Sequence, residues 1–142
     1  MSDPIVVTVL DRALAAGTPL LLGTLGEIVA ERSGILNLGV EGMMSVGAVT
    51  GFMTAVATGS PWLGLLAAVA AGAAVSLLHA FASVDLKANQ VISGTALNIL
   101  AGGLTVYLCQ IIFNQQRTRA FTHGIPKLTV PLLSQIPVLG GI

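Results

Sequence analysis

Long apolar runs separated by short polar stretches dominate the chain. Residues 61–84 and 91–113 contain no Asp, Glu, Lys or Arg. As helices rising 1.5 Å per residue, both runs exceed the roughly 30 Å hydrocarbon core of a bilayer. Two further apolar runs cover residues 13–30 and 34–59, and the second carries a single charge, Glu41. The pattern predicts an all-α fold with about four membrane-spanning helices.

Composition supports this interpretation. Of the 142 residues, 54% are hydrophobic and 8% are charged, and the mean hydropathy is +0.91. A soluble domain carries about 25% charged residues, so the expected surroundings of this chain are the lipid bilayer. The formal net charge is zero, which provides no basic field for binding nucleic acid.

The first span has an irregular beginning. Pro4 suits the first turn of a helix, but Asp11 and Arg12 then interrupt the apolar pattern. We expect a span over residues 13–30, with a kink at Pro19. Asp11 and Arg12 would then mark one membrane interface, and Glu27, Glu31 and Arg32 the other. An amphipathic surface helix over residues 4–12 is the alternative for the preceding stretch.

Residues 34–42 place an amide and a carboxylate within an apolar run, which predicts a second span with a broken start. A carboxylate in hydrocarbon is costly, so Glu41 is expected to serve a pathway or a contact. Glu41 and Ser45 share one helix face, and Asn37 could cap the helix. The glycines assigned to helix breaking or close packing are Gly34, Gly39, Gly42, Gly47 and Gly51.

The third and fourth spans have clearer boundaries. Ser60 and Pro61 form a helix start, with Ser60 as the N-cap, and residues 85–90 form a polar connection. In the fourth span, small and amide side chains recur every four residues and form one stripe. We expect this stripe to face protein or a water-filled path rather than lipid.

These polar positions are the candidates for a substrate path. Glu41 would accept hydrogen bonds from substrate or hold a neighbouring helix, and Asn98 would bind substrate or form an interhelical hydrogen bond. His79 is expected to be a packed side chain, with proton relay as the alternative. The candidate path residues are Asn37, Glu41, Ser45, Gln90, Gly94 and Asn98.

Enzymatic chemistry is not indicated. The sequence contains neither GxxxxGK[ST] nor GxGxxG, the motifs that cradle nucleotide phosphates. His79 and His123 lack Cys or paired-carboxylate neighbours at ligand spacing, so no metal site is expected. No nucleophile, base and orienting group can be assembled from so few polar residues. We therefore expect no catalytic residues and no cofactor.

The end of the chain is rich in proline. Pro126, Pro131 and Pro137 interrupt an apolar sequence, which favours a short re-entrant or interfacial segment over a regular fifth span. The basic residues from Arg117 to Lys127, which include Arg119, are interpreted as a solvated loop or a docking surface.

Three stretches carry a resemblance to a known family. They are LGTLGEIVAERSGILNLGVEGMM at residues 22–44, followed by Gly47 and Ala48; LKANQVISGTALN at residues 86–98; and IPVLG at residues 136–140. Together they resemble the N-terminal part of bacterial ABC importer permeases for nucleosides and simple sugars. This family belongs to the wider group that contains the ribose and branched-chain amino acid permeases.

The resemblance implies a multi-pass subunit of the bacterial plasma (inner) membrane. Its implied partners are a second permease subunit, cytoplasmic ATP-binding subunits that hydrolyse ATP, and an extracellular substrate-binding protein. It also implies that residues 1–142 form a partial transmembrane domain, truncated before the segment that couples to the ATPase. The competing functions are a permease for branched-chain amino acids, a channel without ATP coupling, and an assembly subunit.

Two arguments about orientation disagree. The family layout places the turns containing Arg32 and Lys87 in the cytoplasm. The positive-inside count favours the reverse, because Arg117, Arg119 and Lys127 outnumber those two residues. We follow the resemblance.

Overall fold

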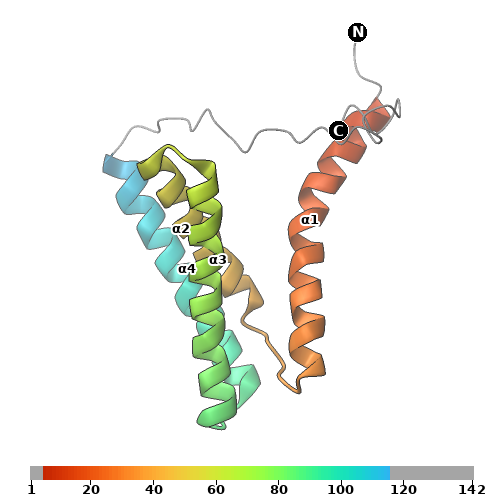
Figure 1. The fold of residues 1–142 in the computed structure, drawn as a ribbon, viewed down its shortest axis with the longest axis vertical. Helices are drawn as coiled ribbons and strands as arrows, with labels where there is room; N and C mark the ends of the chain where they lie inside the picture. The colour runs from red at the N-terminus through yellow and green to blue at the C-terminus, as the bar shows by residue number, and fades with distance from the viewer. Residues whose placement is uncertain (1–4, 116–142) are drawn as a thin grey trace. The chain divides into compact units, whose positions relative to one another are not determined.

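The computed structural model describes residues 5–115, which form four long α-helices and one π-helical turn (Figure 1). Each helical span is long and apolar enough to cross a membrane, which confirms the predicted all-α transmembrane fold. The elements are α1 (Ile5–Arg32), α2 (Val40–Thr58), α3 (Pro61–Ala80), η1 (Phe81–Asp85) and α4 (Gln90–Gln115).

The chain divides into two units, with the boundary between Leu25 and Gly26. Within the first unit, the described residues are 5–25 of α1. The remainder of α1, with α2, α3, η1 and α4, belongs to the second unit, which contains the candidate site.

The first helix extends beyond the expected span of residues 13–30 at both ends. Helix α1 begins at Ile5 and passes through Asp11, Arg12 and Pro19. Asp11 and Arg12 are exposed, and charged side chains that project from a helix surface do not interrupt its backbone hydrogen bonds. The stretch considered as a separate surface helix is therefore the first part of α1.

Helix α1 ends at a glycine in the left-handed region. Gly34 has a φ of 84°; its N–H donates to Glu31 O at 2.9 Å, and the N–H of Ile35 donates to Ala30 O at 3.1 Å. This pair of bonds is a Schellman motif. It turns the chain out of the helix into a non-helical stretch that lasts until α2 begins at Val40, as the broken second span predicts.

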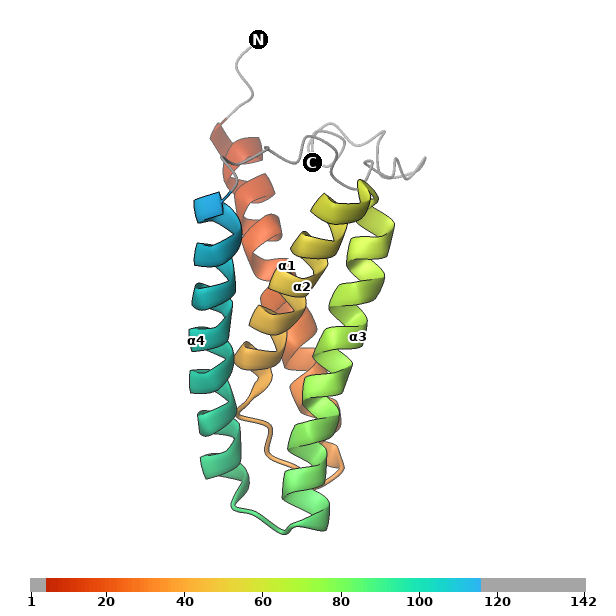
Figure 2. The ribbon, with the colours of Figure 1, turned by 90° about the vertical axis from the view of Figure 1, so that its left-hand side faces the viewer.

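Helix α2 lies between α3 and α4, which contact each other far less (Figure 2). Small residues allow α2 and α3 to approach closely. A Cβ added at Gly64 would lie 2.7 Å from both Gly51 O and the Cβ of Ala55, and one added at Gly47 would lie 3.1 Å from Ala68 O. The backbones of α2 and α3 therefore touch along this seam.

The α2–α3 turn matches its sequence signals. Gly59 has a φ of 70°, and its N–H donates to Ala55 O at 2.9 Å. Ser60 is the N-cap of α3, with its Oγ accepting from Leu63 N at 3.5 Å, and Pro61 is the first helical residue. The predicted cap and start are confirmed.

The α3–α4 connection is shorter than predicted, because the helix continues through η1 to Asp85. The N–H of Leu86 donates to Phe81 O at 3.1 Å, the five-residue spacing of a π-helix. Asn89 then starts α4: its Oδ1 accepts from Val91 N at 3.0 Å and from Ile92 N at 3.2 Å. The predictions for residues 116–142, including the three prolines and the basic loop, lie outside the described residues.

Candidate functional site

The candidate site is built around residues 34–42, called here the broken segment, which comprise non-helical backbone up to Gly39 and the first three residues of α2. It runs beside α4 from the level of Gln90 to that of Asn98, eight residues or roughly 12 Å along the helix. Backbone outside a helix lacks intrahelical partners for its polar groups, so other groups must supply them. The hydrogen bonds of this segment therefore decide what it can do.

Four backbone N–H groups of the broken segment donate to side-chain oxygens. Two acceptors are the amides of α4, one is the carboxylate of α1, and one lies within the segment itself. The bonds are Leu36 N to Gln90 Oε1 at 2.7 Å, Asn37 N to Glu27 Oε1 at 3.0 Å, Gly39 N to Asn37 Oδ1 at 3.2 Å, and Gly42 N to Asn98 Oδ1 at 2.7 Å. The segment is thus held from two sides.

The α4 amides also donate to carbonyl groups of the same segment. Asn98 Nδ2 donates to Leu38 O at 2.6 Å, and Gln90 Nε2 donates to Gly34 O at 3.5 Å. Each amide therefore acts as donor and acceptor at once. Of the two roles considered for Asn98, the structure shows a hydrogen bond between spans, and its role in substrate binding stays a prediction.

Asn98, rather than Asn37, caps the first turn of α2. The N-cap position is Gly39, which has no side chain to accept a hydrogen bond. Gly42 is the third residue of α2, and an N-cap side chain ordinarily accepts from the N–H at that position. Asn37 instead accepts from Gly39 N. The expectation that Asn37 caps α2 was wrong, because the cap comes from a different helix.

Glycines set the distance between the broken segment and α4. A Cβ added at Gly94 would lie 3.0 Å from Gly39 N and 3.1 Å from Leu38 C. A Cβ added at Gly42 would lie 2.9 Å from Asn98 Oδ1. Both are shorter than ordinary van der Waals contacts. The glycines bring the backbone within reach of the two amides.

Glu41 differs from the other candidates. It stands in the first turn of α2, its side chain is exposed, and it has no hydrogen-bond or ion-pair partner among residues 5–111. A negative side chain near a helix N-terminus is favoured by the helix dipole. Ser45, one turn further, is partly exposed. These two side chains are available to a ligand or another protein chain.

Sequence reasoning missed the role of Glu27, which was placed at a membrane interface. Its side chain is half-buried; Oε1 accepts from Asn37 N, and Oε2 is buried without a partner in the described part of the chain. The signal that could have found this role is a carboxylate in an apolar run, because such a side chain is costly in hydrocarbon unless it has a contact or a function. The same reasoning selected Glu41. Glu31 and Arg32 follow at the end of α1, so Glu27 was interpreted together with them as one group of charges at an interface.

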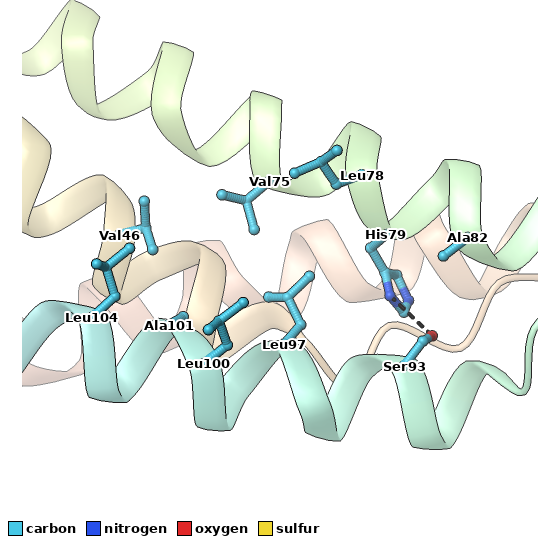
Figure 3. A pocket seen from close by; sticks show the side chains of 10 residues that line it. All are labelled: Val46, Val75, Leu78, His79, Ala82, Ser93, Leu97, Leu100, Ala101 and Leu104. Atoms are coloured by element: carbon cyan, nitrogen blue, oxygen red, sulfur yellow. Dashed lines mark hydrogen bonds between the residues drawn. The ribbon is translucent and has the colours of Figure 1, made fainter.

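His79 lies away from the broken segment's amide contacts, between α3 and α4. It is 3% exposed, and its Nδ1 lies 3.4 Å from Ser93 Oγ (Figure 3). Its Nε2 is buried with no partner among the described residues. Aliphatic side chains and the His79–Ser93 pair line a cavity of about 360 Å³. This matches the expected packed histidine; the proton relay stays untested.

Two cavities lie beside His79. A second cavity, of about 400 Å³, is lined by residues of α1, α2, α3 and the broken segment, including Asn37 and His79. Residues 5–111 contain no group of three His, Cys, Asp or Glu side chains that could hold a metal ion. The polar chemistry of the described chain is concentrated in amides and isolated carboxylates.

Comparison with known proteins identifies related sequences. The family described as branched-chain amino acid transport system / permease component matches residues 9–138. The chain is 42% identical over 135 residues to the guanosine ABC transporter permease protein NupQ of Bacillus subtilis, covering 91% of this chain and 42% of the relative. It is also 42% identical over 135 residues to the putative glucose ABC transporter permease protein TsgC13 of Haloferax volcanii, covering 92% and 40%.

A third relative is the nucleoside ABC transporter permease protein NupC of Lactococcus lactis subsp. cremoris, 42% identical over 135 residues, covering 91% of this chain and 42% of the relative. The chain thus spans about two fifths of the length of these relatives. No solved structure matches it significantly. The relatives and the four apolar helices agree on a multi-pass membrane protein.

Proposed function

The chain belongs to the family of branched-chain amino acid transport system permease components, and from this membership we propose that it is a permease subunit of an ATP-driven importer. The observation that supports the proposal is a non-helical backbone between two candidate membrane spans, α1 and α2, that side chains of α1 and α4 hold by hydrogen bonds. Transporters often build substrate sites where backbone outside a helix lies against neighbouring helices.

The proposed substrates are nucleosides or simple sugars. The related permeases are named for guanosine, nucleosides and glucose. These molecules share a ring that carries several hydroxyl groups, and a carboxylate accepts hydrogen bonds from hydroxyls. Glu41, which has no partner among the described residues, suits that role. A branched-chain amino acid is the alternative, and the family description supports it.

Within this path, the candidate residues have two roles. Glu41 and Ser45 lie on one exposed side of α2 and would meet the substrate. Asn37, Gln90, Gly94 and Asn98 would form the supporting wall, because their polar groups or backbone already contact the broken segment. To contact substrate, the wall residues would have to exchange their hydrogen bonds to the broken segment for hydrogen bonds to the substrate.

The partners follow from the proposed importer. A second permease subunit would complete the path, since the exposed apolar faces of these helices need protein or lipid against them. ATP-binding subunits would hydrolyse ATP, an extracellular binding protein would deliver substrate, and the plasma membrane would hold the assembly. Two discrete packings of the subunits would alternate access to the site.

Purification and uptake test this function directly. The tagged complete permease should co-purify with an ATP-binding subunit from membranes. Vesicles that contain the assembly should take up radiolabelled guanosine or glucose only with ATP and binding protein present. Uptake of leucine alone would favour the amino acid alternative. Flux that needs no ATP, or the absence of any bound ATPase subunit, would contradict the importer.

A further inference from the structure

A hydrogen-bond relay connects Glu27 on α1 to the first turn of α2. Glu27 Oε1 accepts from Asn37 N at 3.0 Å, and Asn37 Oδ1 accepts from Gly39 N at 3.2 Å. Asn37 Nδ2 also lies 3.4 Å from Met43 Sδ, on α2 itself. Asn37 therefore holds the residue at the N-cap and a residue one turn later, while Glu27 holds Asn37.

We propose that Glu27 is a positioning residue for transport, which acts through Asn37 to place Glu41 in the path. This proposal rests on the proposed function, in which Glu41 meets the substrate. The amides of α4 hold the opposite side of the broken segment. Without Glu27, the Asn37 N–H loses the acceptor that the structure gives it, and the α2 start is held from one side.

The geometry assigns this role to the acceptor oxygen rather than to the charge. No ion pair involves Glu27 in the described part of the chain, and the contact that defines its position is a single hydrogen bond to a backbone N–H. A glutamine side chain has the same length and also carries an acceptor oxygen. An aspartate keeps the charge but withdraws its oxygens by one methylene, about 1.5 Å.

The test compares Glu27→Gln with Glu27→Asp in the complete permease. The first measurement is substrate uptake into vesicles, with KM and maximal rate determined separately and abundance measured by immunoblot. The second is the rate of maleimide labelling of a Glu41→Cys variant, in a background with Cys109→Ser and any other thiols removed. The second measurement does not depend on transport.

We expect Glu27→Gln to stay within about twofold of the parent in both measurements. Glu27→Asp should change the labelling rate and raise KM by about three- to tenfold, the loss expected for one hydrogen bond, at unchanged abundance. The reverse order, with glutamine impaired and aspartate normal, would assign the role to charge and overturn the proposal. So would two variants with unchanged labelling. If the labelling rate changes but KM does not, Glu27 positions α2 and Glu41 does not lie in the substrate path, which contradicts the proposed role in transport.

Discussion

The Oδ1 atom of Asn98 accepts a hydrogen bond from the backbone N–H of Gly42 at 2.7 Å, so a side chain of α4 caps a different helix, α2. The same amide donates to Leu38 O at 2.6 Å, on the other side of the N-cap Gly39. One side chain therefore fixes both the last residues before α2 and its first turn. Capping in trans lets α2 begin after Gly39, a residue that has no side chain with which to cap the helix.

Replacing Asn98 should lower stability more than it changes substrate affinity. In Asn98→Ala, Gly42 N and Leu38 O both lose the partner that the structure gives them. Interhelical hydrogen bonds in membranes average about 0.6 kcal/mol, but two backbone groups left unsatisfied cost more, so we expect a loss of about 1–3 kcal/mol. A lower thermal denaturation midpoint of the purified permease would measure it.

Ile99→Ala is the matched control, because Ile99 is the next residue on α4 and is 73% exposed. It removes more side-chain volume but no hydrogen bond to the broken segment. The two variants should therefore separate, with only Asn98→Ala losing stability. A normal midpoint with a raised KM in Asn98→Ala would instead favour direct substrate binding.

The stripe on α4 shows how much of the candidate site can be predicted from the sequence. Four-residue spacing predicts that Gln90, Gly94 and Asn98 share a face and that this face meets protein, and the structure places the broken segment there. The sequence does not show which backbone atoms meet the amides. Asn98 and Gly42 are 56 positions apart, and their register depends on how three helices pack.

Glu27 and Asp11 show what the charge pattern does not predict. Both were interpreted from local charge, as markers of membrane interfaces. Asp11 lies inside a continuous helix, and Glu27 holds backbone of the broken segment. Charge pattern indicates where a side chain is costly, but a tertiary hydrogen bond can offset that cost. That bond is invisible until the chain is folded.

Gly94→Ala should displace the broken segment from α4. The added Cβ would lie 3.0 Å from Gly39 N and 3.1 Å from Leu38 C, and backbone atoms cannot move aside as a flexible side chain can. Overpacking of this kind costs about 1–3 kcal/mol. We expect lower abundance and a lower denaturation midpoint.

Gly103→Ala serves as the control for Gly94→Ala on the same helix. A Cβ at Gly103 meets nothing within 4 Å in the structure, and alanine is favoured over glycine in a helix by up to about 1 kcal/mol. This variant should keep or slightly raise the midpoint. Equal losses in both variants would contradict the close contact at Gly94.

The seam between α2 and α3 gives a second pair of glycines with opposite expectations. Gly64→Ala would place a Cβ 2.7 Å from Gly51 O, whereas Gly72→Ala, two turns later on α3, meets only Met43 O at 3.8 Å. Gly64→Ala should separate the helices and lose about 1–3 kcal/mol, and Gly72→Ala should not. Pulse proteolysis of both variants checks the difference, and similar protection in both would contradict the seam.

Glu41→Gln tests the residue on which the proposed path depends. Glu41 is exposed and has no partner among the described residues, so the substitution should leave abundance and the denaturation midpoint unchanged. A hydrogen bond from a substrate hydroxyl to a charged acceptor contributes about 1.5–3 kcal/mol, and a neutral amide oxygen retains part of it. KM for uptake should therefore rise about tenfold, a difference of about 1.4 kcal/mol.

Glu31→Gln is the control for Glu41→Gln. Its side chain is also exposed but lies at the end of α1, so uptake by this variant should be unchanged. Equal kinetics in the two variants would place Glu41 outside the path, whereas a loss of abundance in Glu41→Gln alone would indicate a contact with another subunit.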